Sequence, residues 1–401
     1  MKEGWEYKKL GECFISINNG ANIKQIKGAK GIPITRIETL SNDKFNRERM
    51  GYADILDASP YSSYILNDGD ILMSHINSMK YLGRAVQYLK NEDETIIHGM
   101  NLLRLVPTKD VLSSFLIYQF FTAFFRNQIV SISHQSVNQA SFNTTNLKNL
   151  KLKVPSLSEQ QSIVDYLDSA FAKIDAMKAN AEKALNEAKA LFQASLKEML
   201  EPKEGWEEKK VGDIAEIKGG KRLPKGEKLL SEPTNHKYIR VADFNEYGTV
   251  DLDDIQYISD KVYEQIKRYI IKKEDIYISI AGTIGKSGMV PEELDGANLT
   301  ENACRLILSK DISQKFMYYT TISPEFIRQE IESTKISAQP KLALTRLADI
   351  SIAFPSIVEQ ETIADTLDSL KSKVDRLQEN YDKISQECDA LKQAILRQVF
   401  E

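Results

Sequence analysis

The hexapeptide Pro-Ser-Leu-Ser-Glu-Gln at residues 155–160 decides the fold, because it returns as Pro-Ser-Ile-Val-Glu-Gln at residues 355–360. The spacing of 200 residues then holds without a gap to the end of the chain, where Glu201 matches Glu401. The beginnings repeat as well, since Glu3-Gly4-Trp5-Glu6 returns as Glu204-Gly205-Trp206-Glu207 at a spacing of 201 residues. A duplication of about 200 residues therefore covers the whole chain.

Each copy ends in a segment with the pattern of one long helix. Neither residues 156–201 nor residues 356–401 are interrupted by Pro or Gly beyond the junction, and Ser-x-x-Glu at each start predicts a capping box. Some 43 helical residues would extend about 65 Å. Apolar residues step by four and three along both segments, which predicts a heptad seam. The seam comprises Ile163, Leu167, Ala170, Ile174, Met177, Ala181, Ala184, Ala188 and Leu191, and then Ile363, Leu367, Leu370, Val374, Leu377, Tyr381, Ile384, Cys388 and Leu391.

A seam of this length has to be buried, and the other copy is the obvious partner. Two helices that lie separately on their own domains are the alternative. Because a whole domain lies between the two helices in the chain, parallel and antiparallel pairings are both sterically possible. We favour the antiparallel pair, because it makes the two copies equivalent about a pseudo-twofold axis.

The regions between these helices read as mixed α/β domains. The expected organisation is α+β, with domains at 1–155 and 202–355 and spacer helices at 156–201 and 356–401. The interiors of the copies diverge around shared landmarks, which is typical of two similar domains that recognise different ligands. Strands are expected at 32–37, 70–73, 101–106, 238–241 and 275–280, and one helix per domain is expected at 115–129 and 316–331.

The composition is that of an ordinary globular protein. The 401 residues are 42% hydrophobic and 27% charged, which fits two or three domains. The longest apolar candidate for a membrane span, residues 115–125, is short and contains Gln119 and Thr122. Residues 1–10 are charged and show no signal peptide. We therefore expect a cytoplasmic protein without membrane contact.

The sequence offers no catalytic or metal-binding motif. Its three cysteines are far apart and form no CxxC pair, and its four histidines form no HExxH pattern. Residues 282–287, Gly-Thr-Ile-Gly-Lys-Ser, resemble the end of a P-loop, but Ile280 stands where the first glycine is needed. The tetrapeptides of amino-methyltransferases, GxSxG and GxGxxG are also missing. We expect no cofactor, no metal and no catalytic residue in this chain.

Charge is distributed unevenly along the chain. Residues 1–155 contain 19 Lys and Arg against 14 Asp and Glu, a balance of +5, whereas residues 202–355 contain 23 against 25, a balance of −2. Because the whole chain has a net charge of −4, the two helical segments together have −7. The acidic part is therefore the helical part, and nucleic acid is expected to contact the domains.

Basic residues on polar, glycine-containing loops are the candidates for DNA contact. Lys and Arg neutralise phosphates, and Arg also reads guanine through a bidentate fork. A solvated loop is the alternative for any single residue, but a Gly/Lys loop followed by an Arg-bearing strand recurs in both domains. The polar residues after the 70–73 and 275–280 strands suit either base edges or turns. The candidates are Lys24, Lys27, Arg36, His75, Asn77, Lys80, Arg84, Lys221, Arg222, Arg240, Thr283 and Lys286.

The order of these features resembles the specificity subunits of type I restriction-modification systems. The resemblance spans the entire chain and rests on four motifs. It implies a non-catalytic protein with two target-recognition domains, each reading one half of a split DNA site. At one position the copies depart from each other, because Thr-Arg-Ile-Glu at 35–38 stands where Ile-Arg-Val-Ala stands at 239–242. The motifs are the Gly-Trp-Glu starts, Tyr-Ile-Arg-Val-Ala-Asp at 238–243, Gly-Thr-Ile-Gly at 282–285 and the Pro-Ser-x-x-Glu-Gln junctions.

The resemblance also implies partners. These are double-stranded DNA, two methyltransferase subunits that use S-adenosylmethionine, and two translocase-nuclease subunits that use ATP and Mg²⁺. The helix pair would separate the domains as a ruler and present a surface to the partners. An enzyme with an unusual site and a coiled-coil adaptor that binds only proteins are the alternatives. The residues expected to form the spacer and partner surface are Glu159, Gln160, Ile163, Leu167, Glu359, Gln360, Ile363 and Leu367.

Overall fold

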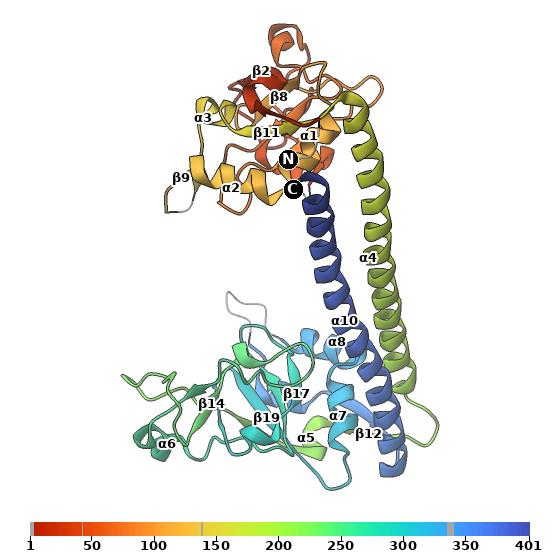
Figure 1. Ribbon diagram of the computed structural model, residues 1–401. Coiled ribbons are helices and arrows are strands. Elements are labelled where there is room, and N and C mark those ends of the chain that lie inside the picture. Colours follow the sequence, from red (N-terminus) through yellow and green to blue (C-terminus); the bar gives the residue numbers. More distant parts are fainter. Residues whose placement is uncertain (1–3, 42, 138, 335–340) are drawn as a thin grey trace. The chain divides into compact units, whose positions relative to one another are not determined.

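The computed structural model describes residues 4–41, 43–137, 139–334 and 341–401 (Figure 1). Glu3, at the start of the first repeat, lies outside these residues. The chain divides into two compact units, of which the first comprises Met1–Asn180 with Lys383–Glu401 and the second comprises Ala181–Asp382. Each unit thus combines one globular part with sections of both long helices.

Each globular part contains a four-stranded antiparallel sheet, and the strand order is the same in both. The order is β2-β8-β5-β7 in the first unit and β13-β19-β16-β17 in the second. The inner strands β5 and β16 are buried at every position, so the same apolar segments in both copies give the same sheet. The bounds are β2 Phe14–Asn19, β5 Ile71–Met73, β7 Ala85–Gln87, β8 Leu103–Pro107, β13 Ala215–Gly219, β16 Ile276–Ser279, β17 Ser287–Met289 and β19 Ala303–Leu308.

A two-stranded sheet joins the start of each repeat to the strand before its long helix. Strand β1 (Glu6–Lys9) pairs with β11 (Lys151–Val154), and β12 (Glu207–Lys210) pairs with β20 (Ser351–Phe354). Short elements complete the units. They are β3 Leu40–Ser41, β4 Lys44–Phe45, β6 Ile76–Asn77, β9 His134–Gln135, β10 Ala140–Ser141, β14 Lys237–Ile239, β15 Gln256–Tyr257, β18 Asn298–Leu299, α3 Thr144–Lys148, α5 Val211–Ile214, α6 Asp260–Ile266 and α9 Leu344–Ala348.

The expected strand at 32–37 is wrong. Isolated bridges at Ile34 and a 3-10 helix at Ile37–Thr39 occupy this stretch instead. Pro33 lacks the N–H that a continuous ladder needs, which explains the interruption.

The prediction of a single helix at 115–129 and at 316–331 is also wrong, because the structure has two helices in each of these stretches. Helices α1 (Ser113–Phe120) and α2 (Ala123–Ile132) replace the first, and α7 (Gln314–Thr321) and α8 (Pro324–Ser333) replace the second. The break falls where Thr122 accepts a hydrogen bond from the Phe125 N–H, and Ser323 accepts one from the Phe326 N–H. These are N-caps, so each hydroxyl starts a new helix inside a continuous apolar pattern.

The long helices are α4 (Leu157–Met199) and α10 (Ile357–Phe400), each fastened at its start to its own domain. Gln160 is buried, and its side-chain oxygen accepts a hydrogen bond from the Leu112 N–H at 2.9 Å while its amide donates to the Asp110 and Pro155 carbonyls. Gln360 makes the equivalent three bonds in the second repeat. The repeated glutamine therefore fixes where each helix leaves its domain.

The capping box is realised only in part. The Ser156 hydroxyl accepts a hydrogen bond from the Glu159 N–H, as expected, and Ser356 does the same for Glu359. The Glu159 carboxylate, however, accepts from the Trp5 indole N–H at 2.6 Å, as the Glu359 carboxylate does from Trp206. In each repeat, the Gly-Trp start thus contacts the Glu-Gln junction, which lies about 150 residues away in the sequence.

Within each unit, α4 and α10 pack antiparallel, which confirms that expectation. In the first unit Lys392 pairs with Asp175 at 2.5 Å, and the Cys388 thiol donates to the Ile174 carbonyl. In the second unit the Lys189 ammonium donates to the Gln378 side-chain oxygen at 2.7 Å. The predicted α+β architecture, with two mixed domains and a packed pair of long helices, is confirmed.

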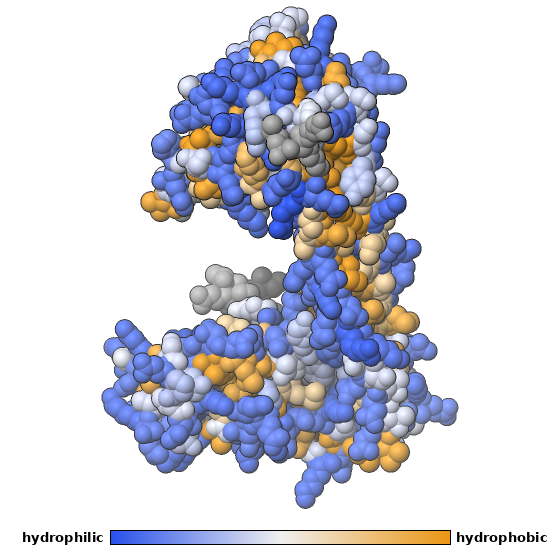
Figure 2. All heavy atoms as spheres, viewed as in Figure 1, coloured by the Kyte–Doolittle hydropathy of each residue, from blue (hydrophilic) through white to orange (hydrophobic). Residues whose placement is uncertain are grey.

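The seam itself differs from the predicted heptads in four positions, of which Ala184 is exposed and the other three are large side chains. Met177, Leu191 and Leu391 are 59%, 61% and 47% exposed, although the pattern placed them inside. In α4 the buried positions continue instead through Leu185 and Phe192. A straight helix with 3.6 residues per turn drifts about 20° per heptad, so the buried stripe moves to neighbouring positions. Figure 2 shows apolar surface along the long helices.

Candidate nucleic-acid interface

In the second unit, three segments that carry predicted DNA-binding residues are joined through the segment 299–302 by backbone hydrogen bonds. The Lys221 N–H bonds the Leu299 carbonyl, the Thr300 N–H bonds the Ile239 carbonyl, and the Ile280 N–H bonds the Asn302 carbonyl. Gly220 makes the crossing possible, since a Cβ there would lie 2.1 Å from the Thr300 oxygen. The structure therefore brings loops from three distant parts of the sequence to one place.

Arg222 and Arg240 share a shallow pocket of about 370 Å³ with Glu301 and Asn302. Arg222 Nε lies 2.6 Å from the Glu301 carboxylate, and the Arg222 side chain is 78% exposed. Arg240 is held more firmly, because it forms a forked pair with the buried Asp243 at 2.5 Å. These carboxylates raise the pKa of both arginines, so both guanidinium groups stay charged while they are paired.

Thr283 and Lys286 lie on the turn after β16, where Gly282 and Gly285 have positive φ angles of 77° and 85°. The Lys286 ammonium donates to the Phe244 carbonyl at 3.1 Å, and its N–H donates to the Ser279 hydroxyl. The glycines form a tight turn between two strands. They do not form a phosphate-binding loop, which would lead into a helix. The hydrogen bonds of Lys286 therefore stabilise this turn.

The first unit repeats this layout with different side chains. The backbone of Gly20 lies against that of His98, as Gly220 lies against Thr300. A Cβ on Gly20 would lie 2.2 Å from the His98 carbonyl oxygen. Lys24 and Lys27 are exposed on the loop that follows. Arg36 is exposed and pairs with Glu38 at 3.3 Å.

The polar residues after β5 form a second group in the first unit. Asn77 lies on β6 and donates to the Ser74 hydroxyl, whereas His75 is half-buried and its Nδ1 has no partner. Burial lowers the pKa of His75, so its ring favours the neutral form. Lys80 and Arg84 both lie over the Tyr81 ring, at 5.4 and 4.6 Å from its centroid. Arg84 also pairs with Asp43 at 3.0 Å.

All four predicted arginines are thus paired with a carboxylate from their own unit, a feature that sequence reasoning missed. The partner acids are far from the arginines in sequence in two cases, and no local pattern marks them. A DNA phosphate that contacted one of these arginines would have to compete with its carboxylate. The pairs are Arg36–Glu38, Arg84–Asp43, Arg222–Glu301 and Arg240–Asp243.

Replacing Glu301 by Gln should therefore raise the affinity of the protein for non-specific DNA roughly several-fold at low salt. The salt dependence should steepen by about one released counterion, because Arg222 becomes free to bind a phosphate. Fluorescence anisotropy with a random duplex over a salt series measures both. Glu216→Gln, which frees Lys218 on β13, is the matched control. Unchanged binding in Glu301→Gln would show that Arg222 does not face DNA.

A buried acid lies under the Gly285 turn and was also missed. Glu330 on α8 is buried, one of its carboxyl oxygens has no partner, and the other would lie 2.3 Å from a Cβ on Gly285. The corresponding residue of the first unit is Ile129, which is fully buried beneath Gly83. Burial raises the pKa of Glu330 from 4.5 to about 7.

We expect the second unit to lose stability as the pH rises through this range. The folded state keeps the Glu330 proton up to about pH 7, whereas the unfolded state loses it near pH 4.5, so the stabilisation is complete below 4.5 and gone above 7. Glu330→Ile should recover up to about 3 kcal/mol at pH 8. Urea unfolding at pH 6 and 8 tests this, with the exposed Glu332→Gln as control. An equal effect at both pH values would contradict it.

The remaining sequence expectations concern metals, cysteines and membranes. Cys13, Cys304 and Cys388 are buried and free. Within the described ranges, no cluster of three or more His, Cys, Asp or Glu could hold a metal ion. No helix in that same part of the chain is both long and apolar enough to cross a membrane.

Comparison with known proteins agrees with this architecture. The family model described as the type I restriction modification DNA specificity domain matches residues 2–187 and 203–386, which is most of the chain. The chain belongs to this family. It is a DNA specificity subunit of a type I restriction-modification system and a non-catalytic member of that complex.

Relatives and solved structures span the chain. A Methanocaldococcus jannaschii protein named as the specificity subunit of the type I restriction enzyme MjaX is 28% identical over 94% of this chain and 88% of its own length. The EcoBI specificity subunit of Escherichia coli is 26% identical over 68% of this chain and 62% of its own length.

The folds of two solved structures are also similar. One chain, from a study of complex assembly and conformational transition of the type I R-M system, has a TM-score of 0.77 at 16% identity, covering 100% of this chain and 98% of that one. The HsdS subunit of Thermoanaerobacter tengcongensis has a TM-score of 0.56 at 16% identity, covering 100% and 97%.

Proposed function

We propose that this chain reads a bipartite DNA target, with one half-site contacted by each globular part. The observation that carries the proposal is the repeated strand crossing at Gly20 and Gly220, which presents different side chains from the same backbone frame. In the second unit Arg222, Arg240 and Asn302 meet at this crossing, and amide and guanidinium groups suit adenine and guanine edges. The first unit offers Lys24, Lys27 and Arg36 on the equivalent segments.

The long helices would hold the two reading units and dock partner subunits. Their net charge of −7 disfavours DNA contact, while Tyr166, Met177 and Leu191 expose apolar surface on α4. Two methyltransferase subunits and two translocase-nuclease subunits are the proposed partners. S-adenosylmethionine, ATP and Mg²⁺ would be used by these partners, in the cytoplasm, and not by this chain.

The test is to map methylated adenine across the genome in cells that express the cognate methyltransferase with and without this chain. A split, asymmetric motif should appear only when the chain is present. Arg222→Ala should relax one half of that motif, and Lys80→Ala should affect only the other half, because each variant alters one unit. Methylation that is independent of the chain would support the alternative of an adaptor that binds only proteins.

A further inference from the structure

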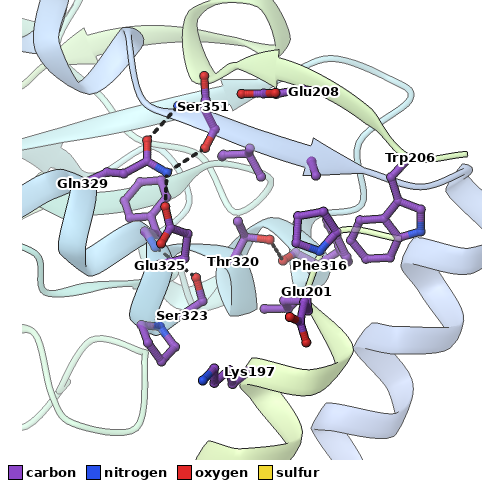
Figure 3. A pocket seen from close by; sticks show the side chains of 16 residues that line it. Lys197, Glu201, Trp206, Glu208, Phe316, Thr320, Ser323, Glu325, Gln329 and Ser351 are labelled. Carbon is purple, nitrogen blue, oxygen red and sulfur yellow. Dashed lines mark hydrogen bonds between the residues drawn. The ribbon is translucent and has the colours of Figure 1, made fainter. Parts of the chain in front are cut away.

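The second unit contains a cavity of about 510 Å³ that is unrelated to the proposed DNA-reading loops. The end of α4, the β12–β20 sheet and helices α7 and α8 enclose it (Figure 3). Trp206, Phe316 and Leu200 supply apolar lining, and Glu208 and Glu325 lie at the sheet and at α8. All lining residues belong to the second unit.

In the first unit the corresponding space is filled by the chain itself. The Phe400 ring lies 6.1 Å from Trp5 and 5.5 Å from Phe115, centroid to centroid, and is buried. The Lys153 ammonium donates to the Phe400 carbonyl at 2.6 Å and lies 5.3 Å from the Phe124 ring centroid. An aromatic side chain and a lysine therefore occupy the space beside Trp5. We call this space, and the corresponding space beside Trp206, the Trp site of each repeat.

Matching contacts establish that the two places correspond. Tyr7 pairs with Lys153 in the β1–β11 register, as Glu208 pairs with Ala353 in β12–β20. The side-chain amide of Gln128 donates to the Lys151 carbonyl, as the amide of the equivalent glutamine on α8 donates to the Ser351 carbonyl.

Five side chains that fill the space in the first unit are replaced by shorter ones in the second. The loss of side-chain volume at these positions accounts for the cavity. The vacated aromatic positions also become acidic, at Glu208 and Glu325. The replacements are Tyr7 by Glu208, Gln119 by Thr320, Phe124 by Glu325, Lys153 by Ala353 and Phe400 by Leu200.

The charges around the cavity favour a basic occupant. Glu201, Glu208 and Glu325 line it with Lys197 as the one cation of its lining. Arg328 pairs with Glu325 at 2.6 Å and neutralises it, so Glu201 and Glu208 face Lys197 alone and the lining keeps one negative charge in excess. An indole and a phenyl ring beside these carboxylates match an aromatic side chain that has a cation next to it.

We infer that this cavity is the docking site for a segment of a partner subunit that inserts an aromatic side chain with a lysine or arginine beside it. The inference rests on the proposed assembly with partner subunits. The first repeat shows the chemistry, because its own Phe400 and Lys153 make that pair of contacts. The last residue of α10 fills the space beside Trp5, and the partner would fill the space beside Trp206.

The test refills the cavity with the residues of the first repeat. The variant Leu200→Phe/Ala353→Lys should fold with an unchanged melting temperature but bind one cognate subunit, methyltransferase or translocase-nuclease, about 30-fold more weakly by calorimetry, the size of an interface hot spot. Glu208→Lys should weaken binding of the same subunit. Glu264→Lys on α6 is the matched control, because it reverses a charge outside the cavity. A photo-crosslinking phenylalanine analogue at Pro202, an exposed residue of the cavity lining, should join a peptide that contains an aromatic and a basic residue.

Unchanged affinity of the refilled variant for both subunits would overturn the inference, as would crosslinks only to a second copy of this chain. Failure of the proposed function is a separate result, because it would appear as methylation that ignores the unaltered chain. If the refilled variant melts at a lower temperature, Glu208→Lys and the crosslink still decide the question, because neither adds bulk to the core.

Discussion

Inserting one heptad into each long helix should change the DNA target that the complex methylates. Seven residues lengthen a helix by about 10 Å, which corresponds to about three base pairs. The unread spacer between the half-sites should grow by that amount while both half-sites stay the same. The physical reason is that α4 and α10 are continuous helices that contribute to both units, so in the proposed ruler a longer helix pair would separate the half-sites further.

The insertion sites follow from the antiparallel register. Pairing of Asp175 with Lys392 and of Lys189 with Gln378 places the Asn180–Ala181 junction opposite the Gln386–Glu387 junction. Whole heptads keep the apolar seam in phase. Long-read methylome sequencing gives the spacer directly, and a heptad in one helix alone is the control, because it breaks the pairing. An unchanged spacer in the double insertion would rule out the helix pair as a ruler.

Replacing Arg305 by Met should cost the second unit about 3–5 kcal/mol of unfolding free energy. Arg305 and Asp275 form a buried pair at 2.8 Å, with side chains 12% and 4% exposed. Without the guanidinium, the Asp275 carboxylate stays buried with the Lys272 N–H as a remaining donor. The melting temperature should fall by roughly 10 °C, measured by calorimetry.

A second substitution at Asp275 shows whether the stability is lost because the ion pair is broken or because the packing around Arg305 changes. Adding Asp275→Leu to Arg305→Met removes the stranded charge and should recover most of the stability. Lys273→Met breaks an exposed pair with Glu292 and should leave the melting temperature unchanged. If the double variant melts as low as Arg305→Met, the buried charge is not the cause. The equivalent pair of Arg104 with Asp70 in the first unit lies at 2.7 Å, so the same series can be repeated there.

The candidate interface was predictable only in outline. The loops were identified because glycine and lysine recur at the same places in both copies. Their partners Asp43 and Glu301 were not identifiable, because each lies at least 40 residues from its arginine in the sequence. Sequence spacing also gave no reason to single out Glu330, which looks like any polar residue of an amphipathic helix until its burial is known.

The sequence by itself determined the duplication, the two long helices, their pairing and the absence of known catalytic motifs, because these depend on period, repetition and local capping. Tertiary structure decided which face of each helix is buried, because the drift of a straight helix accumulates beyond what a heptad count follows. It also decided that one Trp site is filled by Phe400 while the other is open, since that depends on how five distant side chains share one space.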